Sequence, residues 1–302
     1  MIECVANVSE GRDRAAIEKI ASAVDLVGAR LLDVHSDPDH HRSVFTFAGE
    51  EAEVLDAVLS LCRVAAQRID LTRHAGTHPR MGAIDVVPFV PLGDAAMSDC
   101  VRLARRAGAE IAEELGIPVY LYGAAATCEE RANLAGIRRG GFERFAEKIG
   151  RPGWAPDFGP QRIHPTAGVV AVGARSFLVA YNVVLGTNGL DVAKAVAAAI
   201  RERNGGLPGV KALGMSLASR GLAQVSMNLV DITRTTVPEV FGAVQREAAR
   251  HGVRVTESEI VGLVPRAAMA GATGGDIRLA GDLEAKILEE RIASSSHRAS
   301  LT

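Results

Sequence analysis

The chain has 302 residues, of which 48% are hydrophobic, and its formal net charge at pH 7 is −2. This length and composition allow a large buried core, and the near-neutral charge gives no indication of a nucleic-acid or membrane partner. We predict neither a signal peptide nor a membrane span, because the chain lacks a basic start followed by an apolar segment and has no run of about eighteen apolar residues. The cysteines are widely spread and lie in no metal-binding spacing, which predicts reduced thiols in a cytoplasmic protein: Cys4, Cys62, Cys100 and Cys128.

The first half of the chain alternates between patterns typical of strands and of helices. Short apolar runs predict strands at residues 2–6, 29–34, 43–48, 84–90 and 119–122. Apolar residues at helical spacing predict helices at 13–25, 51–70 and 98–115, and the charged stretch 129–150 is also predicted to be helical. Pro88 has no backbone N–H to donate, so we expect the strand 84–90 to lie at a sheet edge or to end early.

A stretch rich in proline and glycine, residues 151–168, separates this pattern from a second one. A loop of this length in a compact protein usually has a function. The second pattern predicts strands and helices in alternation, with strands at 177–184, 210–217, 222–230 and 253–264 and helices at 191–202 and 236–250. Thr236 and Glu239 form a capping box at the start of the last of these helices. Residues 284–291 predict a short helix, and residues 292–302 predict a disordered tail.

The order of these elements predicts an α+β fold made of two lobes. The second half reads strand–helix–strand–strand–helix–strand, and the first half begins in the same order before it adds a helix and a strand. Each lobe is therefore expected to be a mixed or antiparallel sheet with helices on one face. We place the N-terminal lobe at residues 1–176, the C-terminal lobe at 177–291 and the tail at 292–302.

The densest group of polar side chains lies in residues 69–90, between a predicted helix and a predicted strand. His74 and His78 occur here together with the turn-forming residues Gly76 and Pro79, so the segment should form a surface loop. Histidine suits proton transfer because its unperturbed pKa lies near 6.5. From these residues alone, His78 is either a catalytic group or a turn histidine that bonds a neighbouring carbonyl. The histidine spacing could bind zinc on a helix, but Gly76 and Pro79 argue against a helix.

A second polar cluster, residues 35–42, lies between two predicted strands and contains three histidines and two aspartates. These side chains could bind a metal ion. Pro38 lies at the centre of the cluster, and on composition alone a solvated turn between two strands is the simpler interpretation.

The stretch HAGTHPRMGAIDVVPF, residues 74–89, resembles the signature of the formiminotransferase family. Other segments are similar to later or earlier blocks of that family: ECVANVSEG (3–11), LLDVHSDPDHHRSVFTF (31–47), PVYLYG (118–123), WAPDFGP (154–160), LAQVSMNL (222–229) and IVGLVP (260–265). The resemblance covers roughly the first nine-tenths of the chain, which makes it far more specific than a short motif. It implies two subdomains with a substrate cleft between them.

The resemblance implies an enzyme that transfers the formimino group of N-formimino-L-glutamate to N5 of tetrahydrofolate in histidine degradation. The products would be 5-formimidoyltetrahydrofolate and L-glutamate, tetrahydrofolate would be a co-substrate, and no metal would be needed. The resemblance also implies a homodimer and, because the chain ends near residue 300, a stand-alone enzyme whose product passes to a separate cyclodeaminase. Three alternatives stay open: formyl transfer or 5-formyltetrahydrofolate handling on the same scaffold, a non-enzymatic folate-binding module and, more distantly, a metal-dependent hydrolase.

The resemblance implies roles for individual residues as well. His78 matches the family's catalytic histidine and would act as a general base and then a general acid. His74 would support the site, Arg42 would meet a substrate carboxylate by bidentate pairing, and Arg80 would also bind substrate. At His35 this sequence departs from family members that have an acid there.

A folate-binding segment is also implied, at residues 159–168. Backbone N–H groups and polar side chains of this segment could bind a pterin or a glutamyl carboxylate, and its glycines would allow close approach. The segment consists of Gly159, Pro160, Gln161, Arg162, Ile163, His164, Pro165, Thr166, Ala167 and Gly168. Arg162 and His164 replace more apolar residues of some relatives. From the sequence alone, a linker between the lobes is the favoured interpretation.

Overall fold

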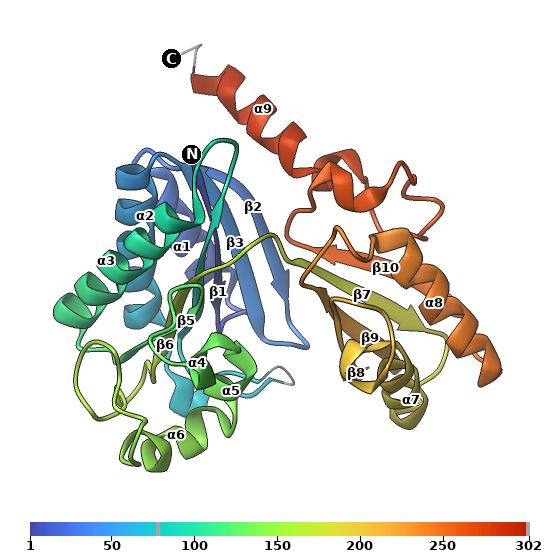
Figure 1. The fold of residues 1–302 in the computed structure, drawn as a ribbon, viewed down its shortest axis with the longest axis horizontal. Coiled ribbons are helices and arrows are strands. Elements are labelled where there is room, and N and C mark those ends of the chain that lie inside the picture. The colour runs from blue at the N-terminus through green and yellow to red at the C-terminus, as the bar shows by residue number, and fades with distance from the viewer. Residues whose placement is uncertain (77–78, 300–302) are drawn as a thin grey trace. The chain divides into compact units, whose positions relative to one another are not determined.

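The computed structural model of the protein describes residues 1–76 and 79–299. The chain divides into two compact units, unit 1 from Met1 to Arg175 and unit 2 from Ser176 to Thr302, each with its own sheet and core (Figure 1). The predicted α+β class is confirmed, with one six-stranded mixed sheet and one four-stranded antiparallel sheet. Within the part of the chain that the structure describes, no helix is both long and apolar enough to cross a membrane.

Unit 1 is built on a sheet with the strand order β2-β3-β1-β4-β6-β5. The strands that pair antiparallel are β1 (Ile2–Val8), β2 (Arg30–Asp37), β3 (Arg42–Gly49) and β4 (Ile84–Pro91). The strands β5 (Val119–Gly123) and β6 (Val170–Ala174) extend the sheet in parallel beyond β4. Phe45, Phe47 and Phe89 of the central strands are fully buried, so the core of unit 1 lies against the middle of this sheet.

Three long helices of unit 1 cover one face of its sheet (Figure 1): α1 (Arg14–Asp25), α2 (Glu51–Arg68) and α3 (Met97–Leu115). Each helix has apolar residues at helical spacing, and these residues face the core. Ile20, Val58 and Leu103, one from each helix, have no exposed surface. The stretch 129–150, predicted as helical, consists of three short helices: α4 (Glu129–Ala132), α5 (Leu134–Arg138) and α6 (Gly141–Ile149).

The second face of the unit 1 sheet carries a smaller core cluster. Tyr120 of β5 faces away from the main core, because successive side chains of a strand point to opposite faces, and its ring packs 5.3 Å from that of Phe145 in α6. Lys148 of α6 donates to the carbonyls of Gly136 and Ile137 in α5, at 2.8 and 2.7 Å. These contacts hold α5 and α6 on the sheet.

Unit 2 has the strand order β10-β7-β9-β8, and all its strand pairs are antiparallel. Its elements are β7 (Val179–Leu185), α7 (Leu190–Ile200), β8 (Val210–Leu217), β9 (Leu222–Leu229), α8 (Val237–Arg250) and β10 (Val255–Val261). The predicted capping box begins α8, where the carboxylate of Glu239 accepts from the backbone N–H of Thr236 at 2.7 Å. The order of strands and helices predicted for this half is confirmed.

The two units share one connectivity. The first four strands of unit 1 lie in the order β4-β1-β3-β2, and those of unit 2 in the order β10-β7-β9-β8. In both units the first strand, counted along the chain, pairs with the fourth and the third, and the third pairs with the second, which is the split βαβ arrangement. Unit 1 therefore repeats the framework of unit 2 and adds α3 to α6, β5 and β6.

The structure corrects two local expectations and adds one strand. β4 is a central strand between β1 and β6, not an edge strand: Pro88 lies opposite Gly173 of β6, and the described pairs with β1 leave Pro88 out. The tail is helical as far as it is described, in α9 (Leu288–Ala299), where Glu289 and Glu290 in the first turn favour a helix. Sequence periodicity also missed the short strand β6.

Two glycines let the α2–β4 connection approach the segment that precedes β6. Gly82 pairs with Gly168, and the backbone N–H of Val169 donates to the carbonyl of Met81 at 3.0 Å. A Cβ on Gly168 would lie 2.2 Å from that carbonyl oxygen, and one on Gly82 would lie 2.1 Å from the carbonyl oxygen of Val169. Only glycine fits such a crossing.

Replacing Gly168 by alanine should destabilise unit 1 more than replacing Gly93. Both glycines have a positive φ, 69° and 57°, but a Cβ on Gly93 would have no atom within 4 Å. The conformation costs an L-residue roughly 1–2 kcal/mol, so both variants should lose this amount. The clash at Gly168 should add about 1–3 kcal/mol. Urea unfolding followed by fluorescence of Trp154, the one tryptophan, measures both losses, and equal losses would show that the crossing tolerates a Cβ at residue 168.

Candidate active site

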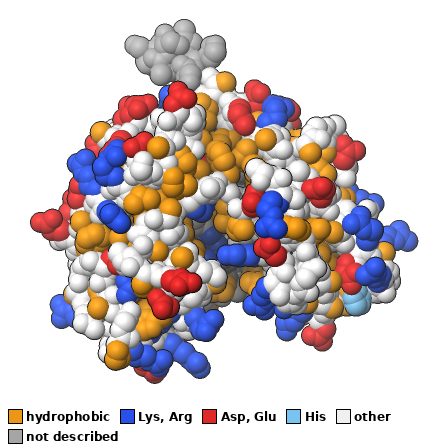
Figure 2. All heavy atoms as spheres, viewed as in Figure 1, with side chains coloured by type: hydrophobic (Ala, Val, Ile, Leu, Met, Phe, Trp, Pro, Cys, Tyr) orange, Lys and Arg blue, Asp and Glu red, His pale blue; other side chains and the backbone are white. Residues whose placement is uncertain are grey.

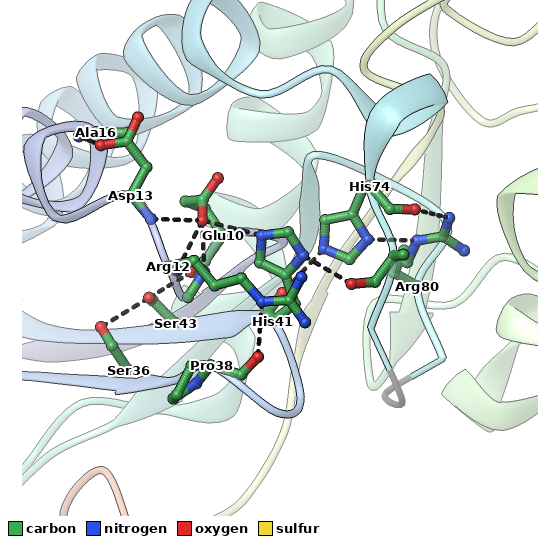
Figure 3. A network of polar contacts seen from close by, with 12 residues as sticks. Glu10, Arg12, Asp13, Ala16, Ser36, Pro38, His41, Ser43, His74 and Arg80 are labelled. Atoms are coloured by element: carbon green, nitrogen blue, oxygen red, sulfur yellow. Dashed lines mark hydrogen bonds and ion pairs between the residues drawn. The ribbon is translucent and has the colours of Figure 1, made fainter. Parts of the chain in front are cut away.

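Four segments of unit 1 meet at one end of its sheet. They are the β1–α1 loop (residues 9–13), the β2–β3 turn (38–41), the α2–β4 connection (69–83) and the segment before β6 (159–169). Strand register explains the meeting, because the C-terminal end of β1 pairs with the N-terminal ends of β3 and β4. Figure 3 shows the polar contacts that join the first three segments.

Glycines allow these backbones to touch. A Cβ on Gly11 would lie 2.2 Å from the carbonyl oxygen of Asp37, so the β1–α1 loop lies directly on the β2–β3 turn. A Cβ on Gly76 would lie 2.5 Å from the carbonyl oxygen of His40, so the α2–β4 connection reaches the same turn. The absence of a side chain at these two positions is therefore a requirement of the site.

Glu10 anchors the β1–α1 loop. Its Oε1 accepts from the backbone N–H groups of Gly11, Arg12 and Asp13 at 2.8–2.9 Å and also contacts Nε2 of His41 at 3.0 Å (Figure 3). Burial acts to raise the pKa of Glu10, but these hydrogen bonds and the charge of His41 outweigh it and leave the pKa below its usual value. The carboxylate is thus held in its charged form.

His41 and His74 join the turn to the α2–β4 connection. Nδ1 of His41 lies 3.0 Å from the carbonyl oxygen of Ala75, and Nε2 of His74 lies 2.9 Å from the carbonyl oxygen of His41. The two rings stack with centroids 4.0 Å apart and an interplanar angle of 8°. Burial lowers the pKa of His74, and the charges of His41 and Arg80 lower it further, against an opposing hydrogen bond and the charge of Glu10.

Arg80 connects the same segment to α6. Its Nε donates to Nδ1 of His74 at 2.9 Å, and Nη2 donates to the carbonyl of His74 at 3.1 Å (Figure 3). The guanidinium also binds both carboxylate oxygens of Glu143, at 2.8 and 3.2 Å. This bidentate pair lowers the pKa of Glu143. Arg80 therefore fixes the end of the connection that follows residue 78.

A group of buried charges lies beside these contacts. Asp85 at the start of β4 accepts from the backbone N–H of Met81 at 2.9 Å and from Arg138 of α5 at 2.5 Å. Arg42, the first residue of β3, faces this pair: burial and the charge of Arg138 lower its pKa to about 9, whereas Asp85 and Asp37 act in the opposite direction. An anionic group is the partner that two neighbouring guanidiniums favour.

Asp37 and His40 close the β2–β3 turn. Oδ1 of Asp37 accepts from the backbone N–H groups of Asp39 and His40 at 2.8 and 2.9 Å, and Oδ2 bonds Nδ1 of His40. Burial acts to raise the pKa of Asp37, but the hydrogen bonds and charge of His40 outweigh it. His35, on β2, pairs with Val44 of β3.

The predicted folate segment, residues 159–168, lies in unit 1 beside the α2–β4 connection. The carbonyls of Thr166 and Ala167 accept from the backbone N–H groups of Leu71 and Ala83, both at 2.9 Å. His164 closes a turn with Gly168, and its Nδ1 accepts from the N–H of Ala167 at 3.0 Å. Burial lowers the pKa of His164. The two segments singled out in the sequence are therefore adjacent.

A buried ion pair between Arg131 and Asp157 fixes the part of this loop before residue 159 to β5. Arg131 donates to Asp157 at 2.8 Å, and Asp157 accepts from the backbone N–H of Leu121, also at 2.8 Å. The guanidinium further donates to the carbonyl of Ala155 at 2.6 Å. The long stretch rich in proline and glycine is thus held by specific contacts to the sheet.

His78 lies outside the described residues, and its role stays a prediction. Sequence reasoning missed Glu10, Glu143 and the pair of Asp85 with Arg138. Glu10 belongs to the block at residues 3–11 that resembles the family, which was the one available signal for it. No sequence signal pointed to Glu143, because its partner Arg80 comes from a distant segment.

The described residues contain no group of three or more His, Cys, Asp or Glu side chains that could hold a metal ion. The polar cluster at residues 35–42 has other partners there: Asp37 binds His40, and His41 binds Glu10. On the face drawn in Figure 2, Lys and Arg side chains are interspersed with Asp and Glu side chains over both units.

Comparison with known proteins gives matches along most of the chain. The family model described as "Formiminotransferase domain, N-terminal subdomain" matches residues 1–175, and that described as "Formiminotransferase domain" matches residues 180–281. The chain is 46% identical to a glutamate formimidoyltransferase of Streptococcus pyogenes, over 89% of this chain and 90% of that protein.

Two further relatives differ in length. A glutamate formimidoyltransferase of Thermoplasma acidophilum is 45% identical over 98% of this chain and 99% of its own length. A formimidoyltransferase-cyclodeaminase of Sus scrofa is 43% identical over 90% of this chain, but the match spans only 51% of that protein.

Replacing His164 by asparagine should make the stability of unit 1 less dependent on pH. The folded-state pKa of His164 is lowered, so its contribution is complete above the unfolded pKa near 6.5 and is lost as the pH falls through the folded value. Asparagine can still accept from the backbone but does not titrate. Between about pH 7.5 and about pH 5.5, Trp154-monitored urea unfolding should show a smaller loss of stability for His164→Asn than for wild type.

The matched control is His251→Asn, in unit 2, where the replaced side chain pairs only loosely with Glu247 at 4.0 Å. This variant should show the wild-type dependence of unit 1 stability on pH. An unchanged pH dependence in His164→Asn would contradict the assignment of a buried neutral imidazole at residue 164.

Proposed function

The chain belongs to the formiminotransferase family, and we propose that it transfers the formimino group from N-formimino-L-glutamate to N5 of tetrahydrofolate. The products are 5-formimidoyltetrahydrofolate and L-glutamate, and the reaction belongs to histidine degradation. The observation that carries this proposal is the identity of 45–46% to two glutamate formimidoyltransferases, over 89–98% of the chain. The adjacency of the signature segment and the folate segment in unit 1 supports it.

The reaction needs a group that moves one proton. The N5 amine adds to the formimino carbon, and the glutamate nitrogen leaves from the tetrahedral intermediate. We assign to His78 the removal of the proton from the attacking nitrogen and its delivery to the leaving nitrogen. An imidazole suits both steps near neutral pH, and such a group typically contributes about 10²–10⁴-fold in rate.

The arginines are proposed to hold substrate carboxylates. Arg42 is half-buried near Arg138, and the loss of hydration that lowers its pKa also strengthens its attraction for an anion. Arg80 would meet a carboxylate by exchanging its bond to Glu143, whose side chain is 61% exposed. Bidentate pairing would orient the donor as well as bind it, and orientation is a large part of the rate of a two-substrate reaction.

Folate is proposed to bind along residues 159–168. Gly159 and Gly168 both have positive φ, 87° and 69°, so this segment presents backbone where other residues would present side chains. Arg162 is exposed and available to a glutamyl carboxylate, whereas His164 is engaged in its own turn. No metal has a step in this mechanism. We further propose that the enzyme is a cytoplasmic homodimer.

The decisive assay uses the purified wild-type protein with tetrahydrofolate and formiminoglutamate, and formylglutamate in a parallel reaction. Loss of tetrahydrofolate that depends on the formimino donor is the expected result. His78→Ala should reduce kcat by about 10²-fold or more while folate binding persists, since it removes the proton-transfer group. A folded His78→Ala protein with an unchanged rate would exclude the assigned role.

The same assay separates the other functions. Turnover with the formyl donor alone would show that the protein transfers a formyl group on the same scaffold. Bound folate without turnover from either donor would make it a folate-binding module. A rate that depends on added divalent metal would favour a metal-dependent hydrolase.

A further inference from the structure

The stacked rings of His41 and His74 must differ in protonation. Both ring nitrogens of His41 face acceptors, the carboxylate of Glu10 and the carbonyl of Ala75, and only an imidazolium can donate at both. His74 accepts from Arg80 at Nδ1 and donates from Nε2, so it is neutral. Stacking a cation on a neutral ring avoids the repulsion that two stacked cations would have.

The backbone at His41 gives independent evidence that its ring has a function. His41 has a φ of 52°, in the left-handed region that an L-residue rarely adopts. The corresponding position of unit 2, directly before β9, is Gly221 with a φ of 62°. A turn shaped only for folding takes glycine there. A strained histidine instead, with both ring nitrogens bonded, points to a role for the side chain.

The contacts of His41 and His74 fix the described residues Ala75 and Arg80, which precede and follow His78 in the sequence. Ala75 is held through its carbonyl by His41, and Arg80 is held by Nδ1 and the carbonyl of His74. Residue 78 lies between these two points in the sequence. Both anchors are within three residues of His78 in the sequence, and small displacements of catalytic groups cost large factors in rate.

We propose that His41, held as an imidazolium by Glu10, is a positioning residue that fixes Ala75, three residues before His78. The enzyme then needs two histidines in opposite states, His78 neutral to accept a proton and His41 protonated to hold the loop. This inference rests on the proposed function of His78. It adds the requirement that catalysis declines at alkaline pH when His41 loses its proton.

The groups around His41 determine the sign of this effect. From the β1–α1 loop it faces the carboxylate of Glu10, and Arg12 lies on the same loop and donates to the carbonyl of Pro38. From the α2–β4 connection it faces His74, with Arg80 behind it, and its own turn contributes the paired Asp37 and His40. Glu10 is the direct charge partner and favours the imidazolium. Removal of its charge should therefore weaken the preference of the ring for the form that donates at both nitrogens.

Ring ¹⁵N chemical shifts of the eight histidines test the charge of His41 without substrate. We expect an imidazolium for His41 at about pH 7 in the wild-type protein, and a neutral Nε2-protonated ring for His74. His41→Asn and His74→Gln assign the two signals. A neutral His41 in the wild-type protein at this pH would overturn the proposal, whatever the activity.

The pH dependence of kcat tests its consequence. Glu10→Gln keeps an oxygen for the three backbone N–H groups but removes the charge that favours the imidazolium, and it should move the alkaline limb to lower pH. In His41→Asn the limb should disappear, because the amide is uncharged at every pH and asparagine tolerates the left-handed backbone. Glu18→Gln, on the exposed side of α1, is the matched control and should keep the wild-type profile.

The outcomes remain separable. Arg42, whose pKa burial lowers to about 9, is another group able to produce an alkaline limb, and a limb retained in His41→Asn would assign it to such a group and overturn the proposal. No turnover by wild type with either donor would instead defeat the proposed function, and the ring shifts would still decide whether Glu10 and His41 form the charged pair.

Discussion

Contact between backbones, permitted by glycine, is the constraint on which the site of unit 1 depends. At Gly11, Gly76, Gly82 and Gly168 a Cβ would lie 2.1–2.5 Å from a carbonyl oxygen of another segment. Real Cβ atoms essentially never lie so close to another heavy atom, so only glycine at these four positions lets the segments approach this closely. The polar side chains can then bond across the crossings, because none of the segments has to span a gap. The catalytic histidine proposed at residue 78 lies between two of these glycines in the sequence.

Burial and hydrogen bonding together set the charges of Glu10 and His74 at these crossings. Glu10 and Asp85 are carboxylates that accept from backbone N–H groups, and each also binds one cationic side chain. At Glu10 these bonds outweigh burial and lower the pKa, so this carboxylate keeps its charge and stabilises the protonated form of its partner. His74 shows the opposite case, because burial and neighbouring cations keep it neutral. A neutral and a charged imidazole can therefore be maintained side by side, which solvent-exposed histidines of equal pKa could not do.

Sequence periodicity predicted the fold class and the element order, because strands and helices of both units bury one regular face. It misjudged Pro88, since the cost of a missing N–H depends on which side of the strand needs a bond, and that is set by neighbours far away in sequence. The tail was predicted from its polar composition, which does not reveal the helix-favouring first turn of α9. For the site, polar composition pointed to the segment around His74 and the family resemblance pointed to residues 159–168, but neither singled out Glu10 or Glu143. Their partners lie 31 and 63 residues away, so only the strand register and the packing of α6 bring them together.

The shared connectivity of the two units shows which part of the site is specific to unit 1. In unit 2 the connection between the second helix and the fourth strand is short, residues 251–254, whereas in unit 1 the same connection runs from residue 69 to residue 83. The longer connection contains the histidines, Arg80 and two of the four close-contact glycines. This longer connection contacts the β1–α1 loop and the β2–β3 turn. Unit 2 has a loop and a turn at the corresponding places, between β7 and α7 and between β8 and β9. The sheet and helices that the two units share position these loops, so the unusual backbone at His41 can be maintained at the end of an otherwise regular framework.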